Sequence, residues 1–306
     1  MSWVRELQLT NFRCYKNARL TDLSAGPVVL HGPNGAGKTN MLEAVSYLVP
    51  GRGMRGAKIM EIQRRGDGNT PWSVSARVET SYGETRVGTG RDPVRDSKRI
   101  VRINGATAKG QNALGEYLSC VWLTPQMDGL FIEGASGRRR FLDRLVFAFD
   151  PAHSGRVSRY ENALRQRSRL LQDGPVDPVW LEGLEQTMAE SGVAIAAARQ
   201  DFTGRLQQAC ERCRDDTFPR AQLQTVGTLE ELLCSAPALE VEEMFRYQLR
   251  ESREGDARTG GAASGPHKSD LAVYYAAKDM PADQCSTGEQ KALLIGMILA
   301  HARLIN

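Results

Sequence analysis

The sequence predicts an α/β fold, in which a mixed sheet with helices carries an antiparallel β subdomain and an inserted helical arm. Three observations predict this fold. A short apolar stretch leads through a glycine-rich loop into a helical pattern, strand-like alternation fills residues 72–103, and helical periodicity dominates residues 138–250. One more strand pattern and a final helix follow, so we expect the body of the fold to be discontinuous in sequence.

These patterns predict three domains. The expected domains are a head of residues 1–135 and 265–306, a helical arm of residues 136–250 and a flexible connector of residues 251–264. The connector is expected to be flexible because it is rich in glycine, alanine and serine, which leave the backbone mobile.

Two strands are expected near the N-terminus. Residues 3–9 alternate, with Leu7 and Leu9 on one face and polar side chains on the other. Residues 28–30 are wholly apolar, as in a strand that is buried on both faces, and they lead directly into the glycine-rich loop. A helical pattern follows the loop. The segment therefore reads as strand, loop and helix.

Further strands are expected in the middle and near the end of the chain. Residues 72–103 predict an antiparallel sheet that turns at Asn104-Gly105, a sequence that favours two-residue hairpins. Residues 118–123 and 271–275 are further strand candidates. Between them the expected helices are interrupted near Pro151, Gly174-Pro175 and Pro237.

Composition and charge limit the class of protein. The 306 residues are 41% hydrophobic and 25% charged, which is ordinary for a globular protein with a sizeable core. A formal net charge of +4 is too small to indicate nucleic-acid binding by itself. No apolar run approaches the roughly 20 residues that cross a bilayer, and the N-terminus lacks the pattern of a signal peptide. We therefore expect a cytoplasmic protein that does not enter membranes.

The six cysteines indicate no disulfide scaffold in a chain of this length. Cys210 and Cys213 form a lone C-x-x-C inside a helical pattern, with no second pair and no nearby histidine to complete a metal site. Two reduced cysteines on one helix are the favoured interpretation.

The glycine-rich loop is the strongest motif in the sequence. Gly32, Gly37, Lys38 and Thr39 satisfy G-x-x-x-x-G-K-[ST] between a strand pattern and a helix pattern, the context that the motif requires. Backbone N–H groups of such a loop surround phosphate oxygens, the lysine reaches the β- and γ-phosphates, and the Thr hydroxyl binds Mg²⁺. The predicted ATP-binding residues of this phosphate loop are Gly32, Pro33, Asn34, Gly35, Ala36, Gly37, Lys38 and Thr39.

A second anion-binding helix end is expected at Ser286-Thr287-Gly288-Glu289-Gln290, which we call the signature segment. A hydroxyl and a glycine at a helix start present unpaired N–H donors. Two such ends make sense if each subunit supplies one and the triphosphate lies between two subunits. The alternative is an ordinary serine N-cap on an amphipathic core helix.

Together these segments resemble the ABC-type ATPases of the structural-maintenance-of-chromosomes class, and more closely the RecF family of bacterial recombination-repair proteins. LQLTNFRCY resembles the family's opening strand and turn, with Cys14 where asparagine is usual. GPNGAGKTNMLEAVSYL and GRGMR resemble its phosphate loop, helix and following arginine motif. SGPHKSDL and STGEQK resemble two later motifs, with Lys268 replacing an arginine and Glu289 replacing a glutamine. The segment from Pro125 through GASGRRRFLD resembles the family's proline turn and the helix start that follows it.

The resemblance implies an ATP-dependent clamp that dimerises head to tail and binds DNA at gaps and stalled forks. It implies cooperation with RecO and RecR in loading recombinase. It also implies roles for further residues near the nucleotide. These are Gln126 as a candidate sensor of Mg²⁺ and the γ-phosphate, Arg13 and Arg55 near the nucleotide, and Ser286, Gly288 and Glu289 facing the γ-phosphate held by the partner.

Hydrolysis in this class needs an apolar strand that ends in Asp-Glu, and the sequence contains no such segment. Our expectation is therefore a fragment of a longer gene product, with a truncated protein that only binds ATP as the alternative.

DNA contact is expected along an arginine stripe. Residues 138–169 contain nine arginines against three acids, and arginine contacts phosphates through charge-assisted hydrogen bonds. A solvated helix face or part of the dimer interface are alternative interpretations. The candidate DNA contacts are Arg138, Arg139, Arg140, Arg156, Arg159 and Arg165.

Two rival functions remain open on the sequence. A small-molecule phosphoryl transferase would use residues 138–250 as a lid over its substrate. A nucleotide-binding interaction module without catalysis would suit the absent carboxylates.

Overall fold

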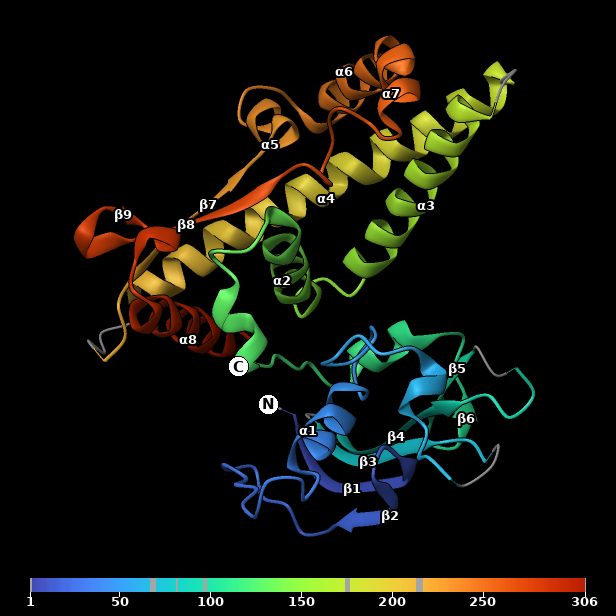
Figure 1. Ribbon diagram of the computed structural model, residues 1–306, viewed down its shortest axis with the longest axis vertical. Helices are drawn as coiled ribbons and strands as arrows, with labels where there is room; N and C mark the ends of the chain where they lie inside the picture. The colour runs from blue at the N-terminus through green and yellow to red at the C-terminus, as the bar shows by residue number, and fades with distance from the viewer. Residues whose placement is uncertain are drawn as a thin grey trace. The chain divides into compact units, whose positions relative to one another are not determined.

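The computed structural model describes residues 2–66, 70–80, 82–95, 98–173, 177–212 and 217–305. The chain folds into two compact units, Met1–Trp122 and Leu123–Asn306, which we call unit 1 and unit 2. Each unit has its own secondary structure and its own core (Figure 1).

Unit 1 is built on a six-stranded antiparallel sheet in the order β2-β1-β3-β4-β5-β6 (Figure 1). Its strands are β1 (Trp3–Phe12), β2 (Tyr15–Leu20), β3 (Ser73–Thr80), β4 (Gly83–Arg91), β5 (Arg99–Ile103) and β6 (Ala106–Thr107). The helical elements are α1 (Lys38–Ser46) and the 3-10 turns η1 (Ile59–Ile62) and η2 (Gln111–Glu116). The predicted antiparallel subdomain is confirmed.

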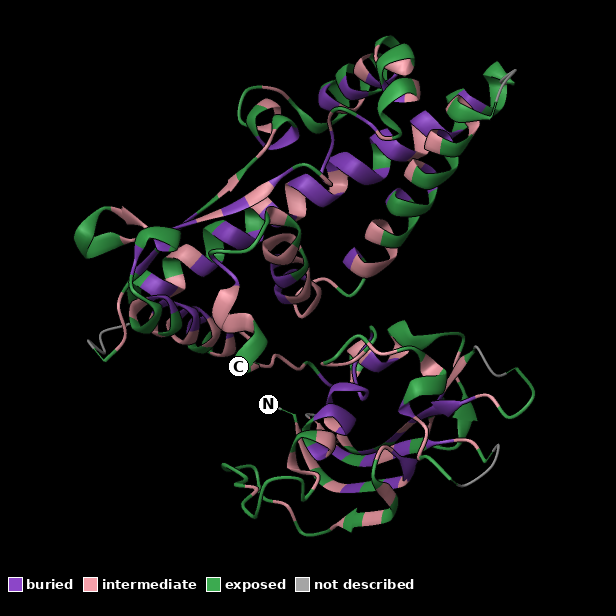
Figure 2. Ribbon diagram, viewed as in Figure 1, coloured by how far each residue is buried: buried purple, intermediate pink, exposed green. Residues whose placement is uncertain are grey.

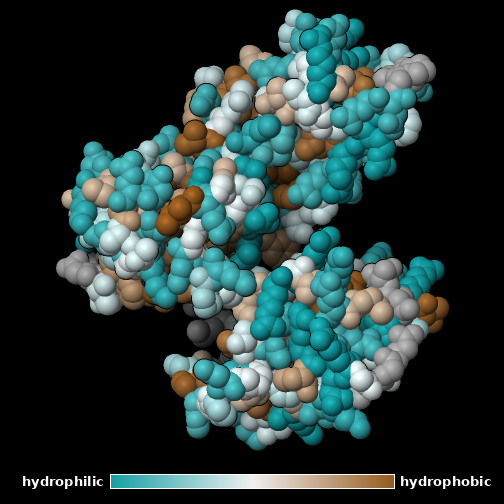
Figure 3. All heavy atoms as spheres, in the orientation of Figure 1, coloured by the Kyte–Doolittle hydropathy of each residue, from teal (hydrophilic) through white to brown (hydrophobic). Residues whose placement is uncertain are grey.

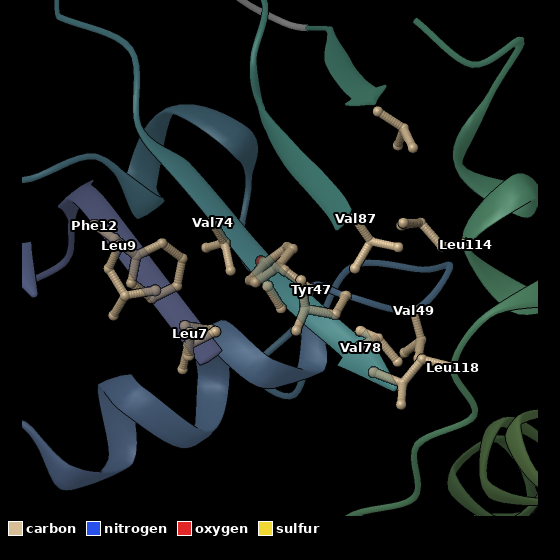
Figure 4. Close-up of a cluster of buried hydrophobic side chains, with 14 of the residues drawn as sticks. Leu7, Leu9, Phe12, Tyr47, Val49, Val74, Val78, Val87, Leu114 and Leu118 are labelled. Carbon is tan, nitrogen blue, oxygen red and sulfur yellow. The ribbon is translucent and has the colours of Figure 1, made fainter. Parts of the chain in front are cut away.

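Period-two alternation places the apolar side chains of this sheet on one face. Leu7 and Leu9 of β1 are both 1% exposed, and they lie beside Val74 and Ala76 of β3 in the strand register. Figure 4 shows Leu7, Leu9 and Val74 in one cluster with Tyr47, which follows α1. The register also confirms the predicted hairpin turn.

That turn joins β5 to β6 through Asn104 and Gly105, whose φ angles of 50° and 87° are both positive. A two-residue hairpin turn of this kind requires positive φ at both positions, which glycine and asparagine tolerate best.

Two predicted strands of unit 1 are not formed. Residues 28–30 and 118–123 have no strand assignment, and Val29 is 80% exposed. An apolar stretch becomes a strand only where a neighbouring strand accepts its hydrogen bonds, and all described strand pairs of the six-stranded sheet involve other segments.

Unit 2 combines long helices with a three-stranded antiparallel sheet in the order β7-β8-β9. Its longer helices are α2 (Ala135–Phe147), α3 (His153–Gln172), α4 (Pro178–Arg212), α6 (Ala238–Glu251) and α8 (Thr287–Leu304). The shorter helices are α5 (Thr228–Leu233) and α7 (Arg253–Thr259), with 3-10 turns η3 (Pro125–Gly129), η4 (Ala276–Lys278) and η5 (Ala282–Gln284). The strands are β7 (Ala221–Val226), β8 (Asp270–Tyr275) and β9 (Met280–Pro281).

Helix α4 is the centre of unit 2. Its 35 residues contact α2, α3, α5, α6, β7 and α8, and Figure 2 shows buried residues along much of its length. Buried ion pairs join the neighbouring helices to it. Arg167 of α3 binds Glu185 of α4 at 3.0 Å and Asp256 of α7 at 2.7 Å, and all three side chains are at most 2% exposed.

The structure divides the chain differently from the predicted domains. Residues 270–275 form β8, which pairs with β7 inside the expected arm, and α8 packs on α4. The strand β7 was not predicted. The head and arm of the sequence prediction are therefore not the two compact units of the structure, and the division stays a functional proposal.

The expected flexible connector contains regular secondary structure. Residues 253–259 form α7, and Asp256 accepts hydrogen bonds from Arg167 and from Ser252 at 2.7 and 2.6 Å. The connector therefore contains a helix that is joined to α3 by a buried ion pair, and its flexibility stays a prediction. The breaks near Pro151 and Pro237 fall at helix boundaries, whereas Gly174-Pro175 and Cys213 lie outside the described residues.

Both units expose mainly hydrophilic surface in the view of Figure 3. Among the described residues, no helix is long and apolar enough to cross a membrane. The same residues contain no cluster of three or more His, Cys, Asp or Glu side chains that could hold a metal ion.

Candidate nucleotide-binding site

The phosphate loop forms the entry to α1, as predicted. Gly37 is the N-cap of α1 with φ 95°, and it offers no side chain to cap the first N–H groups of the helix. Gly35 also has a positive φ of 86°. Left-handed positions of this kind are typical of loops whose successive backbone N–H groups bind phosphate oxygens.

Gly37 is fixed by sterics as well as by φ. A Cβ atom at this position would lie 2.6 Å from Tyr15 Oη and 2.8 Å from Cys14 Sγ. The β1–β2 turn therefore packs directly against the last glycine of the loop. Only glycine fits between this turn and the start of α1.

Lys38 reaches across the loop that precedes it. Its Nζ donates hydrogen bonds to Gly32 O at 2.7 Å and Pro33 O at 2.8 Å. The ammonium group thus lies on the loop that the motif assigns to the β- and γ-phosphates. Thr39 is exposed in the first turn of α1, where its hydroxyl is accessible to a cation. These residues fit a nucleoside triphosphate.

Arg13 and Arg55 meet at a buried acid that the sequence analysis missed. The Glu43 carboxylate of α1 is 0% exposed and accepts two hydrogen bonds from Arg13, at 2.6 and 2.9 Å, and one from Arg55 at 2.8 Å. The hydrogen bond to Glu43 is the main cause that raises the pKa of Arg13. Two arginines against one acid leave positive charge beside the loop.

This cluster is connected to the phosphate loop by one residue. Arg55 also donates to Asn40 Oδ1 at 2.9 Å, and Asn40 N donates to Gly37 O at 2.8 Å. Asn40 Nδ2 donates to Cys14 Sγ at 3.2 Å. The helical periodicity of α1 could have indicated that Glu43 faces inward, and a buried acid needs a cationic partner.

Arg99 is a second missed residue near α1. It donates to Gly51 O at 2.6 Å and to Tyr47 O, and its guanidinium lies 5.3 Å from the centre of the Tyr47 ring. Burial lowers its pKa to about 10. It holds the segment after α1 onto β5.

The signature segment begins α8, as predicted. Ser286 is the N-cap, and Ser286, Thr287 and Gly288 are exposed. A Cβ at Gly288 would meet nothing within 4 Å, so the fold of this chain does not require glycine there. Space beside this helix end is therefore open.

Glu289 closes a capping box with Ser286. Its carboxylate accepts hydrogen bonds from Ser286 N and Ser286 Oγ, both at 2.9 Å, and from Lys278 Nζ. The hydrogen bond from Lys278, followed by those from Ser286, lowers the pKa of Glu289 to about 2. Lys278 was not predicted as part of this site.

Gln126 lies in the exposed turn η3 of unit 2. The turn is joined to the signature helix by an ion pair between Asp128 and Lys291 at 3.1 Å. The turn that carries Gln126 contacts α8 within unit 2. Lys38 belongs to unit 1, so the structure does not place Gln126 relative to the phosphate loop.

The family follows from comparison with known proteins. Residues 3–305 match the RecF/RecN/SMC N-terminal domain. The chain is 50% identical over 303 residues to the DNA replication and repair protein RecF of Mesorhizobium japonicum, which covers 98% of this chain and 79% of that protein. It is 48% identical to RecF of Rhizobium rhizogenes over 305 residues, 99% of this chain and 80% of that protein. The chain belongs to the RecF family.

A solved structure confirms the predicted fold class. The structure of the recombination mediator protein RecF-ATPrS in the RecFOR pathway superimposes with a TM-score of 0.87 at 20% identity, over 99% of this chain and 81% of that one. The ABC-type architecture predicted from the motifs is thus the architecture of the RecF family.

The arginines of the predicted DNA-binding stripe in this RecF-family chain fall into two groups, one paired inside unit 2 and one exposed. Arg138 makes a bidentate ion pair with Asp270 at 2.7 and 2.8 Å, Arg139 donates to Ser269 O at 2.8 Å, and Arg156 pairs with Asp150. These three guanidinium groups therefore have acceptors inside unit 2 and are only partly exposed. Arg140, Arg159 and Arg165 are exposed.

Proposed function

We propose that this chain binds ATP at the phosphate loop, dimerises head to tail around it, and in that state binds DNA during replication and repair. The observation that carries the proposal is the loop of residues 32–39, which combines positive-φ glycines, a helix start without a side-chain cap and Lys38 folded back over the loop. Membership of a family of DNA replication and repair proteins supports the cellular role.

The resident ion of the proposed site is Mg²⁺. The Thr39 hydroxyl is the side chain of the phosphate loop that would hold it beside the phosphates, since hard oxygen ligands suit this cation. The role of Gln126 as a sensor of Mg²⁺ stays a prediction from the sequence. Mg²⁺ would neutralise charge on the β- and γ-phosphates. Arg13 and Arg55 would add positive charge at the same site, because one Glu43 carboxylate compensates only one of them.

The proposed partner face is the signature segment. Ser286 and Gly288 at the exposed start of α8 would meet the γ-phosphate held by a second copy of this chain. RecO and RecR are the proposed protein partners, and the solved RecF structure from the RecFOR pathway supports this assignment. DNA beside single-strand gaps is the proposed nucleic acid.

Complementation between two variants tests the dimer. Lys38→Ala removes the phosphate-loop cation, and Ser286→Arg blocks the signature segment, so neither variant alone can form an ATP-dependent dimer. Mixed together, they form heterodimers with one intact composite site, and analytical ultracentrifugation with ATP should detect them. If each variant dimerises like the parent, or if the mixture recovers nothing, the head-to-tail arrangement is wrong.

DNA binding is tested with the exposed arginines. A variant carrying Arg140→Ala, Arg159→Ala and Arg165→Ala should bind gapped duplex more weakly in the presence of ATP. Its slope of log affinity against log salt should fall by about one for each phosphate contact that is lost. Arg205→Ala and Arg258→Ala remove exposed cations from other helices and serve as matched controls. If the test and control variants lose equal affinity for DNA, only the general positive charge of the chain contributes to binding, and these three arginines have no specific role.

A small-molecule phosphoryl transferase was the rival prediction. Family membership favours the repair function instead, and a chain that binds ATP as a monomer and shows no response to DNA would revive the rival.

A further inference from the structure

The start of α8 carries its own carboxylate at the place proposed for a partner's phosphate. Glu289 Oε2 accepts hydrogen bonds from Ser286 N and from Ser286 Oγ, both at 2.9 Å. Glu289 N donates back to Ser286 Oγ at 3.4 Å. The hydroxyl hydrogen of Ser286 is therefore engaged by an anion of the same chain.

Lys278 is the cation that faces this carboxylate. Its Nζ binds Glu289 Oε1, the oxygen that Ser286 does not use, and it also lies 5.3 Å from the centre of the Tyr275 ring. The two side chains are 47% and 29% exposed. Each favours the charged form of the other: Glu289 raises the pKa of Lys278, and Lys278, together with the hydrogen bonds from Ser286, lowers the pKa of Glu289 to about 2.

The backbone places Lys278 at this point. Lys278 ends η4 at the tip of the β8–β9 hairpin, whose register pairs Tyr275 with Met280. Asp279, with φ 46°, makes the tight turn that returns the chain to β9. Residues 282–284 then lead directly into the signature segment. The hairpin tip and the start of α8 are thus fixed to each other by a short, hydrogen-bonded connection.

A free carboxylate at a helix N-terminus would oppose a phosphate at the same place. Both anions seek the same N–H and O–H donors, and their charges repel. The usual residue of the family signature, glutamine, carries no charge and creates no such conflict. This chain has glutamate, so the site needs a compensating cation.

We infer that Lys278 is a positioning residue of the proposed composite site: it binds the Glu289 carboxylate at the α8 N-terminus and compensates its charge when a second copy of this chain presents its γ-phosphate. The inference rests on the proposed function, because it concerns the same half-site. Open space around Gly288 leaves room for that phosphate.

A purely structural role predicts a different behaviour. An exposed ion pair contributes little to folding, and loss of a capping contact would lower thermal stability in every context. A role in charge compensation instead predicts that Lys278 matters only while residue 289 is an acid, and only when ATP joins two subunits.

A double-mutant cycle tests the inference. The variants are Lys278→Ala, Glu289→Gln and the combination of both, with ATP-dependent dimerisation measured by analytical ultracentrifugation and melting temperature measured without nucleotide. Lys278→Ala should weaken the dimer about threefold per site, and about tenfold for a dimer with two sites. The double variant should dimerise as tightly as Glu289→Gln. Lys278→Arg should restore dimerisation, because it restores the cation.

Two controls separate the possible failures. Arg258→Ala removes another exposed cation, which pairs with Glu254, and should not change dimerisation. The Lys38→Ala and Ser286→Arg mixture reports on the proposed function itself. Suppose that this mixture recovers dimers. If Lys278→Ala then dimerises like the parent, or if it weakens dimerisation equally with Glu and with Gln at position 289, only the inference about Lys278 is overturned.

Discussion

The two helix N-termini that we propose to meet one triphosphate are built in opposite ways. Helix α1 begins after Gly37 with no side-chain cap, and the acid of this helix, Glu43, lies buried one turn further on between two arginines. Helix α8 begins at Ser286 with a complete capping box, and its acid, Glu289, lies at the surface.

The difference shows two solutions to one electrostatic problem. At α1 the acid is removed from the helix end and used to fix cations beside the phosphate loop, so the backbone donors of the loop are unobstructed. At α8 the acid stays at the helix end, and a lysine from a neighbouring hairpin compensates it. The first solution depends on buried packing, and the second depends on surface electrostatics. Their responses to mutation should differ accordingly.

The largest expected effect is at the buried acid. Glu43→Gln leaves two arginines without a full counter-charge in a region where the carboxylate is fully buried, and it should lower the free energy of unfolding by about 3 kcal/mol. Urea denaturation followed by circular dichroism measures the change. Glu289→Gln is the matched control at the surface, and it should leave the midpoint of unfolding nearly unchanged. Equal losses in the two variants would remove the distinction between the helices.

The next effect compares the two glycines. Gly37→Ala forces a side chain into a φ of 95° and within 2.6 Å of Tyr15 Oη, which should cost about 2 kcal/mol of stability. Gly288→Ala meets no atom of its own chain and should keep or slightly raise the melting temperature.

The Gly288 variant has a second readout. Its added methyl group would stand where a partner's phosphate is expected, so ATP-dependent dimerisation should weaken although the fold is intact. A Gly288→Ala protein that dimerises normally would contradict the role of this helix end.

A smaller effect concerns the other end of α8 and depends on pH. Burial lowers the pKa of His301 below its ordinary value of 6.5, and the ring packs against both Phe149 and Phe202 with Nε2 at 3.2 Å from Leu145 O. The unfolded chain therefore binds the proton first as pH falls. Stability should be full above pH 6.5 and should decrease by about 1 kcal/mol toward pH 5.

Burial also lowers the pKa of His267 in unit 2, so the two histidines act in the same direction. Far-ultraviolet circular dichroism, to which the long helices of unit 2 contribute strongly, follows the unfolding of that unit across this range. His301→Leu should flatten the slope of stability against pH, whatever its effect on stability at pH 7. An unchanged slope would assign the pH dependence to other groups.

The smallest effect is expected at the ion pair between Lys291 and Asp128. Both side chains are well exposed, so Lys291→Ala should change the free energy of unfolding by no more than about 0.5 kcal/mol. Thermal unfolding monitored by circular dichroism is sufficient to measure it. A loss of several degrees would mean that η3, which carries Gln126, is held to α8 mainly by this contact.

Local patterns in the sequence determined much of this protein. The phosphate loop, the alternation of Leu7 and Leu9, the Asn104-Gly105 turn and the start of α8 at the signature segment were all predicted, because each depends on residues close together in the chain. The family was likewise identified from motifs, since their order and spacing are properties of the sequence alone.

Tertiary structure decided the features that depend on partners far along the chain. Residues 28–30 look like a strand but have no neighbouring strand in the described fold, and residues 253–259 look like a connector but form a helix whose Asp256 binds Arg167. Arg138 looks available to DNA but pairs with Asp270, 132 residues away. The sequence shows only which charged residues are present. Only the folded chain determines whether such a charge is buried, paired or exposed, because burial and pairing depend on distances that sequence spacing does not encode.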